Sequence, residues 1–160
     1  MRSIFQVVQL CRAYRSEEIV AQRKREKEKY KIRMEINEIT GEIVDASIKI
    51  HKILGPGLLE SVYEEVLHYE LTKRGILSQR QMPLPVIYDE IKMEVGFRID
   101  LLVEERVIVE IKSVETVTPF FKKKLLNHLR LTNLEIGLLI NFNEELLKNG
   151  ITRLFNNYAK

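Results

Sequence analysis

Three charged residues, Asp100, Glu110 and Lys112, stand among alternating apolar residues in the segment from Phe97 to Val114. On both sides of residues 104–106 the apolar side chains alternate with a period of two, which predicts two antiparallel strands joined by a tight turn. Glu110 and Lys112 are two residues apart and therefore lie on the same face of one strand. With the turn in this place, Asp100 lies beside them on the partner strand. Two carboxylates and one amine would then share one surface.

This set of groups suits the hydrolysis of a phosphodiester bond. A buried charge costs free energy unless it is paired or bound to a metal. Carboxylates are common protein ligands of Mg²⁺, and the metal lowers the pKa of a bound water and neutralises charge on the phosphate. A neighbouring lysine can orient the attacking water or stabilise the transition state. The D-x9-E-x-K spacing is a loose pattern, however, and a salt-bridged trio at a sheet edge is the alternative.

A second motif stands upstream, at Gly57-Leu58-Leu59-Glu60-Ser61-Val62-Tyr63, and a third at Gly137-Leu138-Leu139-Ile140-Asn141-Phe142. With these motifs, residues 36–156 resemble the GxxExxY protein family, which lies within the PD-(D/E)XK nuclease superfamily. The resemblance implies a restriction-endonuclease-like fold and a nuclease that uses Mg²⁺ or Mn²⁺. It also implies that Glu60, an acidic residue of the first helices, completes the metal site of Asp100 and Glu110. Without the resemblance, Glu60 is simply a carboxylate that the dipole favours in the first turn of a helix.

One helix departs from the pattern of the related nucleases, which often carry Gln-x-x-x-Tyr near the active site. The matching positions hold Lys124 and His128. A lysine keeps the hydrogen-bond donor of glutamine and adds a charge, but it removes an acceptor. Histidine keeps a polar ring. This departure weakens the expectation of catalysis and leaves the expectation of the fold unchanged.

The positive charges of the same helix have two interpretations. Its cationic residues are Lys122, Lys123, Lys124 and Arg130. A lysine cluster is usually a solvated helix face. Next to a phosphodiester site it could instead hold the backbone of DNA or RNA, since phosphate contacts supply most of the non-specific affinity for nucleic acid.

The composition bounds the class of protein. A chain of 160 residues with 45% hydrophobic residues suggests one domain with a proper core. The single Cys11 cannot form an internal disulfide and is typical of a reduced, cytoplasmic protein. No apolar run approaches the length of a membrane span, and no signal-peptide cleavage site follows the apolar residues near the start.

The net charge of +3 is unevenly distributed. Residues 1–33 contain ten Lys and Arg against four Glu, a balance of +6, while the remainder contains 16 against 19, a balance of −3. The basic first 33 residues have three interpretations: a solvated helix or tail, a basic arm that follows phosphates, or an extension that is not native. The domain proper is expected to span 34–160, and its own charge does not argue for nucleic-acid binding.

Helical periodicity predicts three main helices. The first has Thr40 as its N-cap and the apolar stripe Ile43, Ala46, Ile50 and Ile53, and the second runs from Leu58 to Arg74 with the stripe Leu59, Val62, Val66 and Tyr69. Thr118-Pro119 opens the third, with Thr118 as N-cap.

The remaining segments predict strands and one short helix. Residues 79–82 and 83–88 are expected as two extended segments, and Pro83 and Pro85 argue either for edge positions in the sheet or for a break between strands. Residues 135–142 are expected as a central strand. A short helix over 144–148 and a strand over 151–155 are expected to end the domain.

The predicted architecture is α/β, with a mixed central sheet flanked by helices. The leading interpretation is a metal-dependent nuclease acting on nucleic acid, with DNA as the substrate expected from its relatives, and without a membrane partner. A nucleic-acid-binding module that lost turnover and a partner-recruiting interaction protein are the alternatives. Since related nucleases often act as dimers when both strands are cut, a homodimer is left open.

Overall fold

The computed structural model describes residues 34–157, so the expectations for the first 33 residues, including Cys11, lie outside the described residues. Its elements in chain order are α2 (Ile36–Leu54), α3 (Glu60–Lys73), β1 (Ser78–Tyr88), β2 (Ile91–Val103), β3 (Val107–Lys112), α4 (Pro119–Thr132), β4 (Ile136–Asn141), the 3-10 helix η1 (Leu147–Gly150) and β5 (Ile151–Phe155). Over this part of the chain, no helix has the length and apolar character needed to cross a membrane.

The five strands form one mixed sheet in the order β1-β2-β3-β4-β5. β3 and β4 are parallel, and the other neighbouring strands are antiparallel. A parallel pair needs a crossover connection, and α4 provides it between β3 and β4. The predicted α/β fold class with a mixed sheet is therefore confirmed, and it is consistent with a restriction-endonuclease-like core.

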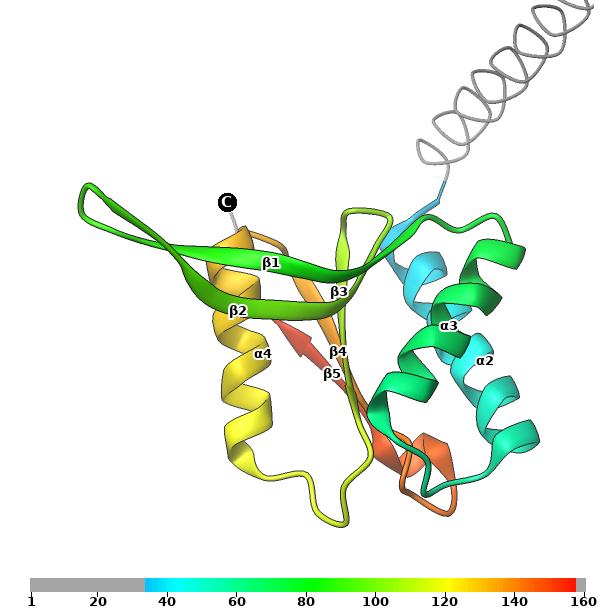
Figure 1. Ribbon diagram of the computed structural model, residues 1–160. Coiled ribbons are helices and arrows are strands. Elements are labelled where there is room, and N and C mark those ends of the chain that lie inside the picture. The colour runs from blue at the N-terminus through cyan, green and yellow to red at the C-terminus, as the bar shows by residue number, and fades with distance from the viewer. Residues whose placement is uncertain (1–33, 158–160) are drawn as a thin grey trace, which may run out of the picture. The chain divides into compact units, whose positions relative to one another are not determined.

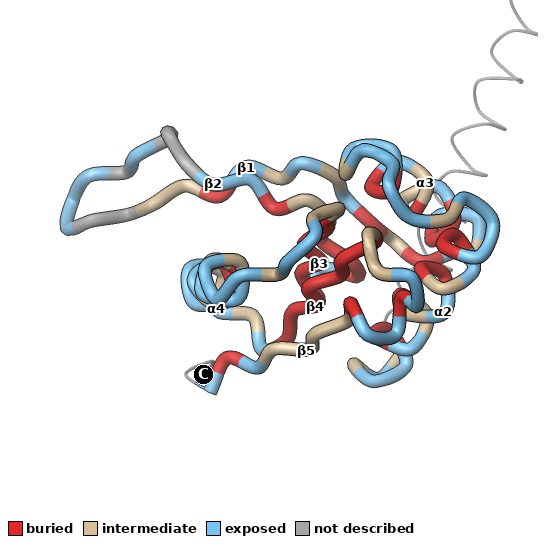
Figure 2. The backbone as a smooth tube through the Cα atoms, turned by 90° about the horizontal axis from the view of Figure 1, so that it is seen from below, coloured by how far each residue is buried: buried red, intermediate tan, exposed pale blue. Residues whose placement is uncertain are grey.

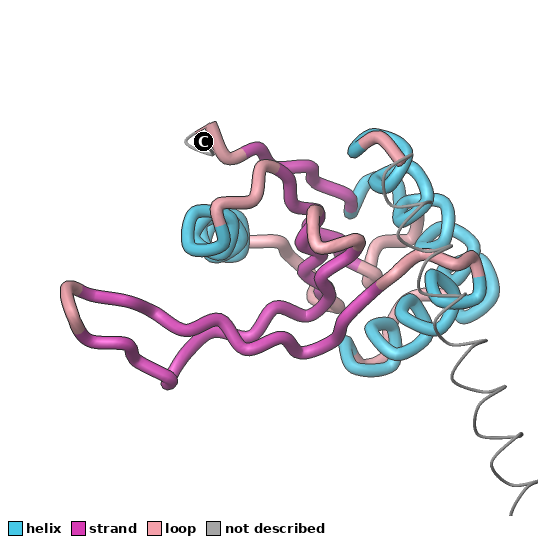
Figure 3. Tube along the Cα trace, turned by 90° about the horizontal axis from the view of Figure 1, so that it is seen from above, coloured by secondary structure: helices cyan, strands magenta, loops and turns pink. Residues whose placement is uncertain are grey.

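Helices cover the central strands on both faces of the sheet. α2 and α3 lie on one side of it and α4 on the other (Figures 1 and 3). Every residue of β3 and β4 is consequently buried, as Figure 2 shows for the centre of the sheet. A strand covered on both faces is expected to be apolar throughout, which makes the charged residues of β3 unusual.

Close packing holds α4 against β4. A Cβ atom added to Gly137 of β4 would lie only 2.7 Å from Leu125 Cδ1 of α4, so the helix approaches over a position without a side chain. Leu125 and Leu129 are completely buried there, together with Ile108 and Leu139 of the sheet. This contact sets the height of α4 above the strands that carry the charged residues.

The predicted helix faces need correction. α2 begins at Ile36, after Glu35 as N-cap, so Thr40 lies within the helix, and Ile53 is 70% exposed. In α3 the predicted stripe is wrong: Leu59 and Tyr69 are largely exposed, and the buried apolar side chains are Tyr63, Leu67 and Leu71. The buried face is shifted by one residue from the expected one.

Tyr63 explains this shift in α3. Its ring stacks on Phe142 at 4.3 Å between centroids, and its hydroxyl donates to the Gly55 carbonyl at 2.6 Å. The same hydroxyl accepts a hydrogen bond from the Leu58 amide at 3.1 Å. Burial of a large tyrosine ring whose hydroxyl group is hydrogen-bonded stabilises this rotation of α3 more than burial of the more apolar residues on the neighbouring face would.

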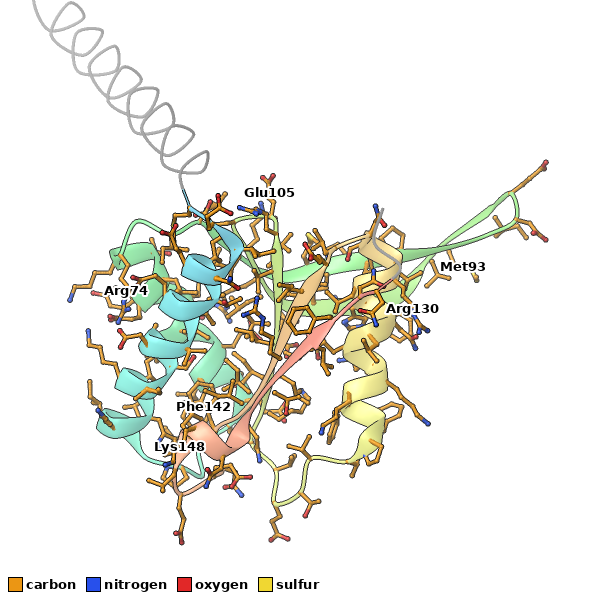
Figure 4. All side chains as sticks on the ribbon, turned by 180° about the vertical axis from the view of Figure 1, so that it is seen from behind. Arg74, Met93, Glu105, Arg130, Phe142 and Lys148 are labelled. Carbon is orange, nitrogen blue, oxygen red and sulfur yellow. The ribbon has the colours of Figure 1, made fainter. Side chains whose placement is uncertain are left out.

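The first two strands form a long hairpin. β1 is continuous rather than two segments, and it occupies the edge position that its prolines predict. Between the pairs Leu84–Phe97 and Val86–Met93 the register shifts, and beyond this irregularity the hairpin extends past α4, with Met93 on the projecting part (Figures 1 and 4).

The end of the domain differs in one element. The expected helix over 144–148 is wrong: a 3-10 helix, Leu147–Gly150, follows a loop, and the Asn149 amide donates to the Leu146 carbonyl three residues earlier. The residues between β4 and η1 form an irregular loop, and η1 leads directly into β5. β5 itself is present where it was predicted.

Candidate active site

The pairing of β2 with β3 brings Asp100 to the charged residues of β3. Leu101 pairs with Val109, so one step further along both strands Asp100 neighbours Glu110. The Asp100 Oδ2 atom accepts a hydrogen bond from the Ile111 amide at 2.8 Å and lies 3.8 Å from Lys112 Nζ. The structure thus brings together the three residues that the strand pattern singled out.

Lys112 connects this group to α3. Its Nζ atom lies 3.2 Å from Glu60 Oε2, and it also donates to the Ile111 carbonyl. The other Glu60 oxygen accepts a hydrogen bond from the Ser113 amide at 3.2 Å. Glu60 therefore faces the lysine and the end of β3.

Glu110 is buried and makes its contacts with α4. Its Oε2 atom accepts a hydrogen bond from Lys124 Nζ at 2.9 Å, and its Oε1 atom lies 2.8 Å from His128 Nδ1. The His128 ring is completely buried, but its contact with Oε1 lacks hydrogen-bond geometry, and neither of its nitrogens forms a hydrogen bond. Both residues that depart from the Gln-x-x-x-Tyr pattern thus touch one carboxylate.

The two carboxyl groups have opposite electrostatic surroundings. Burial raises the pKa of Asp100 to about 6, and the charge of Glu110 adds to the effect, against the Ile111 amide and the two lysines. Burial alone would raise the pKa of Glu110 as well, but contact with His128 and with Lys124 outweighs it and lowers that pKa. Asp100 is the carboxylate whose negative charge is poorly compensated.

Polar contacts fix the chain where it leaves β3. The Asn141 side chain accepts from the Val114 amide at 3.0 Å and donates to the Val114 carbonyl at 2.9 Å. The Ser113 hydroxyl donates to the Leu58 carbonyl at 2.7 Å, which joins this exit to the turn before α3. Sequence reasoning missed both roles, although a buried asparagine at the end of an apolar strand is a signal for a bound backbone segment.

The donor set fits a divalent cation in part. Burial and, after it, the charge of Glu110 raise the pKa of Asp100. A hard cation held by the two carboxylates would relieve their repulsion. Within residues 34–157, however, no three His, Cys, Asp or Glu side chains are grouped so that they could hold a metal ion. Glu60 stands apart because it pairs with Lys112.

The cationic residues of α4 divide into two groups. Lys122 and Lys123 are exposed, and Arg130 is exposed near the other end of the helix (Figure 4). Lys124 differs from them, since its ammonium lies on Glu110 rather than on the outer face. Helical spacing could have indicated this, because Lys124 and His128 are four residues apart and border the inward stripe of Phe121, Leu125 and Leu129.

Comparison with known proteins agrees with this arrangement. The model of one protein family, described as the PD-(D/E)XK nuclease superfamily, matches residues 37–154. No curated protein and no solved structure matches the chain.

Proposed function

The chain belongs to the PD-(D/E)XK nuclease superfamily, and from this premise we propose that it is a metal-dependent nuclease. It hydrolyses phosphodiester bonds of nucleic acid. The observation that carries the proposal is the meeting of Asp100, Glu110 and Lys112 on two adjacent strands, with Asp100 held by the Ile111 amide. These charges lie in a region where the sheet is otherwise apolar, which is costly for a merely structural element.

Each residue of the set has a role in this proposal. Asp100 and Glu110 would hold Mg²⁺ or Mn²⁺, with Glu60 assisting, and the metal would supply an acidified water and charge neutralisation at the phosphate. Lys112 binds a phosphate oxygen and stabilises the charge that develops there. Lys122 and Lys123 hold the phosphate backbone beside the site.

We also propose membership of the GxxExxY family within the superfamily, because each motif residue has a physical role. Gly57 has φ +90°, a conformation that L side chains rarely adopt. Glu60 contacts Lys112 and the Ser113 amide. Tyr63 joins the turn to the core through Gly55. The three residues together position the start of α3 against the end of β3.

One observation favours a second function, nucleic-acid binding without turnover. Glu110 already has Lys124 Nζ at 2.9 Å and His128 Nδ1 at 2.8 Å, so a metal ion would have to displace side chains that already contact both oxygens of this ligand. A carboxylate neutralised by its own protein binds a cation less strongly. Metal binding and cleavage therefore have to be measured separately.

The test is cleavage of supercoiled plasmid and of single-stranded DNA with Mg²⁺ or Mn²⁺. We expect the wild type to cut, and Glu110→Gln and Lys112→Met to reduce the rate by about 100-fold or more, as for the loss of a group that stabilises transition-state charge. The matched control is Glu70→Gln, a buried carboxylate that binds Lys49 and Arg74 elsewhere in the domain. Activity that survives the first two substitutions would contradict the proposed site.

Calorimetric titration with Mg²⁺ and Mn²⁺ separates the alternatives. Metal binding that Asp100→Asn abolishes supports the nuclease. DNA binding without metal binding or cutting supports the binding module. If the protein binds neither metal nor DNA and does not cut DNA, the partner-recruiting interaction protein is the interpretation that remains.

A further inference from the structure

Phe120 is an aromatic residue that the core does not use. It is the second residue of α4, after Pro119, and 67% of it is exposed. A large ring that remains this exposed adds little to folding, since apolar stabilisation is roughly proportional to the area removed from water. Its position next to the site therefore calls for an account other than packing.

Two short contacts connect this exposed ring with the site. The rings of Phe120 and Phe121 meet edge to face at 5.9 Å between centroids. The Phe121 ring in turn lies 5.6 Å from Lys112 Nζ, the proposed phosphate-binding amine. The exposed ring is thus separated from the lysine by a single side chain.

The surroundings of Phe120 are cationic. Lys122 and Lys123 follow it in the same helix and are exposed, and α4 contains no acidic residue. A positively charged surface that carries an exposed aromatic ring is the combination by which proteins bind single-stranded nucleic acid.

A second apolar edge lies on the other side of the lysine. Leu59, which precedes Glu60, is 73% exposed, and the carbonyl of its neighbour Leu58 is bonded to Ser113, directly after Lys112. In Figure 1 the N-terminal ends of α3 and α4 lie at the same end of β3. Exposed apolar residues therefore stand at the starts of both helices, at the end of β3 that carries Lys112.

These features distinguish between paired and unpaired substrates. A duplex offers a protein mainly phosphates and sugars, because the faces of its bases are stacked inside. An unpaired base offers its whole face to an aromatic ring, whatever the sequence. A ring beside the phosphate site therefore finds a free base face chiefly in the second kind of substrate.

We propose that Phe120 is a stacking platform for an unpaired base next to the phosphate held by Lys112, so that this site takes single-stranded nucleic acid. The proposal rests on the proposed function for the position of the phosphate. It does not require turnover, and it therefore also applies to a binding module.

The first test measures binding in the presence of EDTA, where cutting does not interfere. Fluorescence anisotropy of labelled single-stranded DNA, single-stranded RNA of the same sequence and blunt duplex DNA is compared for the wild type, Phe120→Ala and Leu131→Ala. Leu131 is an exposed apolar residue at the far end of the same helix and serves as the control.

We expect Phe120→Ala to weaken binding of at least one single strand by roughly 5- to 150-fold, the range for one stacked base, and binding of the duplex by less than about 2-fold. The DNA and RNA arms show which strand the site takes. Equal losses for single strand and duplex, no loss, or no binding of any single strand by the wild type would each overturn the proposal.

The second test uses the absence of tryptophan from the chain. In Phe120→Trp the new side chain is the sole indole, and stacking of a base should quench its fluorescence as single strand is added and not as duplex is added. Binding without a change in this fluorescence would contradict stacking at Phe120. Since neither test depends on cleavage, an inactive protein that shows both effects overturns the nuclease and leaves this inference standing.

Discussion

At the scale of single residues, Asp100 is a group whose negative charge the fold tolerates poorly. Its pKa of about 6 in the folded protein lies above the ordinary value of 3.8. Between these values the folded state binds more protons than the unfolded state, so the stability falls as the pH rises through this window. Above about pH 6 the carboxylate is ionised in both states, and its destabilising effect on the fold is then complete.

Asp100→Asn should therefore stabilise the protein at pH 8 and have little effect below pH 3.8. The amide keeps an oxygen that can accept from the Ile111 amide, and the charge is gone. With about 1.4 kcal/mol per pKa unit, we expect a gain of roughly 1–3 kcal/mol at pH 8. Urea unfolding at several pH values measures it.

Glu70 gives the control of opposite sign for this pH series. Hydrogen bonding to Lys49 lowers its pKa, so its contribution to stability is present at pH 8 and is lost as the pH falls through the lowered value. Glu70→Gln should destabilise the protein at pH 8. A gain for both variants at pH 8 would argue against the electrostatic explanation.

Lys124 is the second residue with a measurable consequence. Its Nζ atom compensates the buried Glu110 carboxylate, which keeps only His128 when the lysine is replaced. We expect Lys124→Gln to lower the free energy of unfolding by about 1–3 kcal/mol in EDTA, since a buried acceptor loses a charged partner.

Addition of Mg²⁺ should stabilise Lys124→Gln more than it stabilises the wild type. In the variant, the Glu110 carboxylate no longer has to be released from the Lys124 ammonium before it can bind the metal. Thermal unfolding with and without the metal provides the measurement. Lys123→Gln, at the exposed neighbouring position, should behave as the wild type does. An identical response to Mg²⁺ in all three proteins would show that Glu110 is not a metal ligand.

At the scale of the elements, the height of α4 over the sheet decides whether Lys124 and His128 reach Glu110. The helix lies close because Gly137 has no side chain under Leu125. Gly137→Ala should force the two elements apart and destabilise the protein by about 1–3 kcal/mol, as overpacking commonly does. Denaturant unfolding measures the loss, and cleavage or DNA binding should fall with it.

Gly41→Ala is the matched control for this element. Gly41 lies within α2, and an added Cβ atom meets nothing within 4 Å. Here the same substitution should raise the stability by about 0.5–1 kcal/mol, since alanine loses less backbone freedom in a helix than glycine. Equal effects of the two substitutions would show that the contact with Leu125 carries no strain.

At the scale of the whole molecule, binding of nucleic acid has to depend on where the charges lie. Residues 34–160 have a balance of −3, so the net charge of this part opposes a polyanion. The logarithm of the binding constant falls linearly with the logarithm of the salt concentration. Replacing both Lys122 and Lys123 with Gln should make this negative slope shallower by about 1.4, the value for two phosphate contacts on a single strand. Affinity measured over a range of salt concentrations gives the slope.

A control with the same change of net charge distinguishes a local site from the field of the whole protein. Lys52 and Lys148 are exposed lysines around the end of α2 and η1, and Figure 4 labels the second of them. Replacing both with Gln should leave the slope unchanged. If the two double variants lose affinity equally, net charge rather than the face of α4 governs binding.

Much of the site can be predicted from the sequence because strand periodicity is local. Alternation around residues 104–106 is enough to place Asp100 beside Glu110 and Lys112, since the side chains of a strand have a strict period of two. The succession of helices and strands, from which a mixed sheet is expected, and the N-cap of α4 at Thr118 follow from similarly local patterns.

Only the tertiary structure decided the rest, because it depends on contacts between distant elements. The buried face of α3 is set by the stacking of Tyr63 on Phe142, which are 79 positions apart in the sequence. The pairing of Lys124 and His128 with Glu110 depends on how closely α4 lies on the sheet. Hydrophobic periodicity and helix or strand propensity describe each element by itself. The rotation of a helix against the sheet follows from how the side chains of the helix and of the sheet pack together.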